Sequence, residues 1–168
     1  MKRSMVLAIG VLGFAGQAFA QSGSLSKSDK EYLIKDRRGA AYELESAKLA
    51  VSKASRDDVK SYAQKLVHDH IDYNAELEKL VKAQGVTLPT EPDAADKAHM
   101  ADLEKLSGKA FDTLYIQEAL RINAEDKKAA EKEKSETKDP TIKDFIAKFA
   151  DMDAEHEKLA KQLEKSNG

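Results

Sequence analysis

Apolar residues recur at helical spacing through the sequence Leu66-Val67-His68-Asp69-His70-Ile71-Asp72-Tyr73. The repeat extends from Val59 to Leu80, and its members are three or four residues apart, which places them on one face of a helix. His70 takes a position on this face where leucine would be expected. The stretch therefore predicts a long amphipathic helix whose buried face carries an imidazole.

The same periodicity predicts further helices. Long ones are expected at residues 28–54, 57–84, 109–137 and 140–164, and a short one at 94–106. A capping box at Ser28-Asp29-Lys30-Glu31, a C-terminal Gly85 and the N-cap pair Asp139-Pro140 mark their ends. Because every apolar pattern has helical spacing, we predict an all-α fold, a four-helix bundle.

The long connection, residues 85–108, carries the short predicted helix together with Pro89 and Pro92. The other turns are short and force antiparallel neighbours. The long link either crosses the bundle from end to end, as in ferritin-like folds, or folds back over one end. We favour the crossover.

The first residues have the features of a secretory signal peptide. A basic start precedes an apolar run from Met5 to Ala15, and Ala18-Phe19-Ala20 is a small-x-small cleavage box. The run is too short to span a bilayer comfortably. We predict cleavage after Ala20 and a periplasmic protein with no stable membrane span, rather than an uncleaved interfacial anchor. Residues 1–20 would be the signal peptide, 21–27 a flexible leader and 28–168 the bundle domain.

Composition excludes some partners. The chain has 28 basic and 30 acidic residues, and removal of Lys2 and Arg3 leaves a net charge of −4. This balance argues against binding to nucleic acid. Without cysteine, an exported chain is held by its core, by a metal or by assembly.

Polar residues at matching depth form the candidate site. Glu43, His70, Asn123 and His156 each lie about 21 to 24 Å along their predicted helices, near the middle of a bundle about 40 Å long. Asp153 precedes His156 by three residues, so both side chains share a face. We predict a polar layer across the bundle.

The layer has two interpretations. Imidazole and carboxylate from several helices, here His70, His156, Glu43 and Asp153, are the ligands of Fe, Mn, Zn or Cu sites. Alternatively, Glu43 or a tyrosine satisfies two core histidines by hydrogen bonding. A dinuclear site is disfavoured because Val67 stands where a second Glu-x-x-His motif needs a carboxylate. No nucleophile pattern or phosphate loop occurs, so no catalytic residue is predicted.

Several short motifs follow one another along the chain: Glu43-Leu44-Glu45, Lys48-Leu49-Ala50, Val59-Lys60, Asp69-His70, Leu106-Ser107-Gly108, Phe111-Asp112, Tyr115 and His156. Together they resemble a bacterial ferritin-like domain family of unknown function, whose members are often labelled predicted outer membrane proteins. The resemblance covers essentially the whole mature chain and implies a ferritin-like bundle in the cell envelope. The family commonly has His where this chain has Asn123, a weak ligand. The chain shows neither lipid-facing strands nor a second apolar span.

The leading hypothesis is a periplasmic bundle whose polar layer binds a transition metal, in envelope stress tolerance. The alternative is a metal-free structural or interaction module that binds an envelope protein or a second copy of itself. An oxidation enzyme is the third and least favoured hypothesis.

We expect the mature chain to begin at Gln21, because the cleavage box ends at Ala20. Mass spectrometry of the N-terminus of periplasmic material checks this. An intact Met1, or a membrane-bound form that resists a salt wash, would contradict it.

Overall fold

The computed structural model describes residues 25–166, and this part of the chain is all-helical. Its helices are α1 (Lys27–Lys53), α2 (Asp57–Ala83), α3 (Ala94–Glu104), α4 (Gly108–Glu136) and α5 (Pro140–Lys165). Each predicted helix is present, with ends within two residues of the predicted ones. The predicted signal peptide lies outside the described residues. Among the helices that are described, none is both long and apolar enough to cross a membrane.

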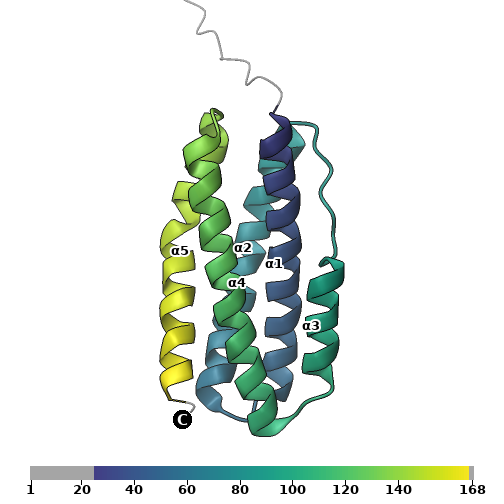
Figure 1. Ribbon diagram of the computed structural model, residues 1–168, viewed down its shortest axis with the longest axis vertical. Coiled ribbons are helices and arrows are strands. Elements are labelled where there is room, and N and C mark those ends of the chain that lie inside the picture. The colour runs from purple at the N-terminus through teal and green to yellow at the C-terminus, as the bar shows by residue number, and fades with distance from the viewer. Residues whose placement is uncertain (1–24, 167–168) are drawn as a thin grey trace, which may run out of the picture.

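The long helices pack side by side into a bundle (Figure 1). α1 contacts α2 and α4, and α5 contacts α4 and α2. The link after α2 runs down the outside of α1 to α3, so that α4 starts at the end of the bundle opposite to the end of α2 (Figure 1). The crossover that the sequence analysis favours is therefore confirmed, and α2 and α4 run in the same direction.

Most of the capping residues predicted from the sequence lie at the observed ends of the helices. Asp139 caps α5, because its Oδ1 accepts a hydrogen bond of 2.8 Å from the Thr141 amide. Gly85, with φ of 65°, ends α2 in a left-handed conformation that glycine adopts without strain. The capping box of α1 was predicted two residues too late. Ser26 has the extended backbone that an N-cap requires, and its Oγ accepts from the Asp29 amide at 3.1 Å.

The turn between α1 and α2 depends on a residue from another helix. Asp112 of α4 is fully buried, and its carboxylate accepts hydrogen bonds from the backbone amides of Ser55 (3.0 Å) and Arg56 (3.1 Å). Arg56, the N-cap of α2, makes no capping hydrogen bond with its own side chain. A carboxylate from α4 therefore satisfies the start of α2.

The core consists of two apolar clusters, one towards each end of the bundle. One is built around Ala47, Leu66 and Phe111, and the other around Leu33, Leu77 and Ile142. Along α1 the clusters leave out the turn around Glu43, and along α2 the turn around His70. The polar layer lies between them.

α3 packs its Leu103 into an apolar cluster and is joined to α4 by a group of ion pairs. Arg121 on α4 donates to Glu118 (2.8 Å), to Glu125 (3.1 Å) and to Asp96 on α3 (3.2 Å). Glu118 also lies 3.3 Å from Nδ1 of His99, whose side chain is 37% exposed. The carboxylates of Asp96 and Glu118 are buried, so Arg121 offsets a real desolvation cost.

We expect Arg121→Ala to destabilise the fold by about 1 to 3 kcal/mol, because it strands these carboxylates. Urea denaturation measures the loss, and hydrogen exchange should accelerate first in α3. Lys105→Ala is the control, since the Lys105 and Asp102 side chains are 70% and 63% exposed. An equal loss of stability in both variants would contradict the role of Arg121 in neutralising the buried carboxylates.

Candidate functional site

The predicted polar layer exists in the structure. Glu43 on α1, His70 on α2, Asn123 on α4 and His156 on α5 are all buried. They lie between the two apolar clusters, so the agreement in depth expected from helix geometry is confirmed.

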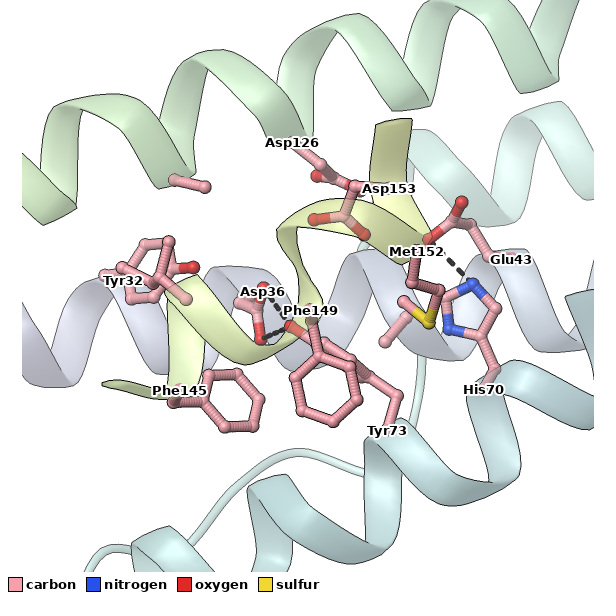
Figure 2. Close-up of a pocket in the computed structure, with 13 residues that line it drawn as sticks. Tyr32, Asp36, Glu43, His70, Tyr73, Asp126, Phe145, Phe149, Met152 and Asp153 are labelled. Atoms are coloured by element: carbon pink, nitrogen blue, oxygen red, sulfur yellow. Dashed lines mark hydrogen bonds and ion pairs between the residues drawn. The ribbon is translucent and has the colours of Figure 1, made fainter. Parts of the chain in front are cut away.

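Three of the predicted ligands line one small pocket, the midplane pocket. Its polar lining is Asp36, Glu43, His70, Asp126 and Asp153, so each long helix contributes at least one side chain. Aromatic rings and Met152 form its apolar wall (Figure 2). The volume of about 30 Å³ is enough for an ion or one to two water molecules.

His70 is the central group of the pocket. Its Nε2 lies 3.2 Å from Oε2 of Glu43, and Figure 2 shows the two side chains pointing toward one another. The angle is poor for a hydrogen bond, and neither ring nitrogen of this buried imidazole has a well-aligned acceptor among the described residues. Burial alone would lower the pKa of His70, but the Glu43 carboxylate raises it. Burial would likewise raise the pKa of Glu43, but the His70 charge lowers it. The pair is therefore held in its ionised form.

The other pocket carboxylates have no cationic partner of this kind. Burial raises the pKa of Asp36 to about 7, although the Tyr73 hydroxyl, 2.7 Å away, donates to it. Burial and the charge of Glu43 raise the pKa of Asp153 to about 6. For Asp126, burial and the charges of Glu43, Asp36 and Asp153 raise the pKa well above its ordinary value. The pocket thus holds more carboxylates than one imidazolium neutralises.

His156 stands beside the pocket rather than in its lining. Its ring centroid is 5.8 Å from that of His70, and its Nε2 lies 2.8 Å from Oδ2 of Asp69. Asp69 pairs with Lys65 at 3.0 Å, and Lys65 pairs with the exposed Glu155 at 3.0 Å. Burial lowers the pKa of His156 despite the bond to Asp69. A chain of polar contacts therefore leads from His156 to the surface.

Asn123 does not face the midplane pocket. Its amide nitrogen donates to the Ala119 carbonyl at 2.6 Å, within its own helix. His68, two residues before His70, is exposed.

Asp36 and Asp126 line the pocket although the sequence did not predict them as site residues. Asp36 belongs to a repeat whose members are alternately three and four residues apart and face inward along α1 and its C-cap: Leu33, Asp36, Ala40, Glu43, Ala47, Ala50 and Ala54. Leu44 and Val51 also have helical spacing in this segment but are only half-buried, so the spacing of apolar residues alone does not single out the face that carries Asp36. Asp126 follows Ile122 by four residues on α4, inside a run of mostly charged residues and alanine. Continuing the helical repeat through that run would have found it.

The comparisons with known proteins yield one match. The family model described as Domain of unknown function (DUF4142) matches residues 15–163. No curated protein and no solved structure matches the chain. The family description names no reaction and no ligand, so the function must be argued from the site.

We expect metal-free protein to lose stability through this pocket as pH rises from about 5 to 8. The folded-state pKa values of Asp36 and Asp153, about 7 and about 6, exceed the ordinary 3.8. In this window the folded state binds more protons than the unfolded chain, so raising the pH favours unfolding. Asp36→Asn and Asp153→Asn should each flatten the slope, measured by urea denaturation with a chelator present.

Comparing the pH slopes of the variants separates the contribution of the pocket carboxylates from that of other titrating groups. The lowered pKa of His156 acts in the opposite direction below about pH 6.5, and Glu133, with a pKa raised to about 7 by burial, adds a similar slope elsewhere. Asp151→Asn, on the exposed side of α5, is the matched control and should leave the slope unchanged. Slopes for Asp36→Asn and Asp153→Asn that match wild type would contradict the expectation.

Proposed function

The chain belongs to the family of the Domain of unknown function (DUF4142), and on the strength of its buried site we propose that it is a ferritin-like four-helix bundle that binds a divalent transition metal. The ligands would be His70, Glu43, Asp126 and Asp153, from the four long helices. The proposed setting is the periplasm, in envelope stress tolerance, after cleavage at Ala20.

One observation carries the proposal. His70 is buried, lacks a well-aligned hydrogen-bond partner, and faces a pocket whose carboxylates exceed the available positive charge. A divalent cation would satisfy both needs, because it would displace a ring proton of His70, take the freed lone pair and offset the carboxylate charges. Imidazole with carboxylates is a donor set that suits Fe, Mn, Zn and Cu ions.

The side chains must adjust to hold the ion. Among the described residues, no group of three or more His, Asp or Glu side chains stands ready to hold a metal. Binding therefore requires the pocket carboxylates to turn about their side-chain bonds toward His70. The half-buried positions of Asp126 and Asp153 leave room for this movement.

His156 has a positioning role in this proposal. It packs against the His70 ring and is itself fixed by Asp69, so it holds His70 in place rather than binding the ion. This assignment differs from the sequence-based hypothesis, in which His156 is a ligand.

The topology supports the ferritin-like assignment. Two antiparallel pairs joined by a long crossover, with α2 and α4 parallel, is the connectivity that such folds use (Figure 1). In these folds, metal sites are built from inward-facing side chains at mid-height of the bundle. The midplane pocket lies at this height.

A metal-free structural or interaction module is the second candidate. It is favoured by the raised pKa values of Asp36 and Asp153, because protons can then neutralise the pocket near neutral pH. In that case the polar layer only helps to specify the packing of the bundle.

We expect chelator-treated protein to show a saturable rise in melting temperature with at least one of Zn²⁺, Mn²⁺, Fe²⁺ or Cu²⁺. A ligand at a hundredfold excess over its dissociation constant stabilises by about 2.7 kcal/mol. The affinity, measured by calorimetry, should fall as the pH is lowered through the pocket pKa values, because protons compete for the same oxygens.

Matched variants locate the binding site. His70→Leu and Asp153→Asn should abolish the shift, whereas the exposed neighbours His68→Leu and Asp151→Asn should retain it. His156→Leu should weaken binding without abolishing it. If no metal moves the transition, and His70→Leu costs about 1 to 3 kcal/mol by stranding Glu43, the metal-free module is the better account.

A further inference from the structure

A surface groove between α4 and α5 adjoins the midplane pocket. It has a volume of about 250 Å³. Ala130, Ile146 and Asp153 line both the groove and the pocket, so only these side chains stand between the two spaces. The remaining groove lining comes from one face of each helix: Asn123, Lys127, Glu131, Lys134, Ala150, Ala154 and Glu157.

Small side chains create the groove. Ala130 on α4 and Ala150 and Ala154 on α5 stand where larger residues would fill the space between the helices. Ala150 and Ala154 are exposed, so they are not needed as core.

Charges at the mouth are balanced. Lys127 on α4 and Glu157 on α5 form an ion pair of 3.2 Å across the groove. Glu157 also pairs with Lys161 at 2.5 Å, so it keeps a cationic partner when Lys127 moves aside, and a surface pair of this kind contributes only about 0 to 1 kcal/mol. Asp153 is the carboxylate that lines both the groove and the pocket in which the His70–Glu43 pair lies.

We propose that this groove is the route by which a divalent cation reaches the midplane pocket, with Asp153 as the first pocket ligand that it meets. The inference rests on the proposed function. A cation that enters past the Lys127–Glu157 pair exchanges water for the Asp153 carboxylate, and then reaches His70 and Glu43. The step is a ligand exchange: water leaves the cation, and the ring proton of the His70 imidazolium passes to solvent as the metal takes its place.

Narrowing the groove should slow the binding and release of the metal ion without changing its dissociation constant. Ala154→Leu adds a bulky side chain to the groove without touching the ligands, and Ala150→Leu is the second variant. Because binding and release use the same path, both rate constants should fall by about tenfold while their ratio, the dissociation constant, stays the same. Ala147→Leu, at an exposed position of α5 outside the groove lining, is the matched control.

Stopped-flow mixing of the metal-free full-length protein with Zn²⁺ or Co²⁺, followed by competition with a chromophoric indicator, measures both rates. The expected result is slow uptake and slow release in Ala154→Leu and Ala150→Leu, with wild-type rates in Ala147→Leu. Wild-type rates in the two groove variants would overturn the route while leaving the metal site intact. Failure of the wild-type protein to take up either metal would overturn the metal site and, with it, the route.

Discussion

The buried ion pair between His70 and Glu43 is the constraint around which the bundle is arranged. Charges withdrawn from water in a helix bundle cost several kcal/mol each unless they are paired. Here the pair, 3.2 Å apart, lies where the two apolar clusters meet. An alanine-rich α1 allows the neighbouring helices to approach closely at this level. The pairing fixes the register of α1 against α2, because sliding either helix would leave one charge unpaired among apolar side chains.

Hydrogen bonds from neighbouring helices stabilise the buried polar groups around this pair. The Tyr73 hydroxyl donates to Asp36, and Asp69 fixes His156 behind His70. Asp126 has no hydrogen bond of this kind among the described residues, and burial together with the charges of Glu43, Asp36 and Asp153 raises its pKa well above the ordinary value. Stability alone would favour an apolar residue at this position. A carboxylate kept at a buried position in spite of the stability that it loses is a candidate functional group, since strongly perturbed carboxylates cluster at functional sites.

Sequence periodicity was sufficient for the helices and for the inward positions of Glu43, His70 and Asp153, because these depend on local spacing. It failed where tertiary context decides. Asp36 interrupts a repeat of apolar residues, and Asp126 lies in a charged run, so their inward orientation depends on which helix packs opposite. Asp112, which caps α2 from α4, is separated from the amides it satisfies by more than fifty residues of sequence. No pattern in either segment alone predicts that contact.

Protons and a metal ion neutralise the same carboxylates, but they have different mechanical consequences. A proton on Asp36 or Asp153 removes repulsion among the carboxylates of α1, α4 and α5 but adds no link between these helices. A cation held by Glu43, His70, Asp126 and Asp153 would join all four long helices at mid-height. Because such a cation would bind only when the bundle is assembled, its binding free energy would add to folding and would suppress opening of α4 and α5. Protection from hydrogen exchange along these two helices therefore separates the two modes of neutralisation, even where the overall stabilisation is equal.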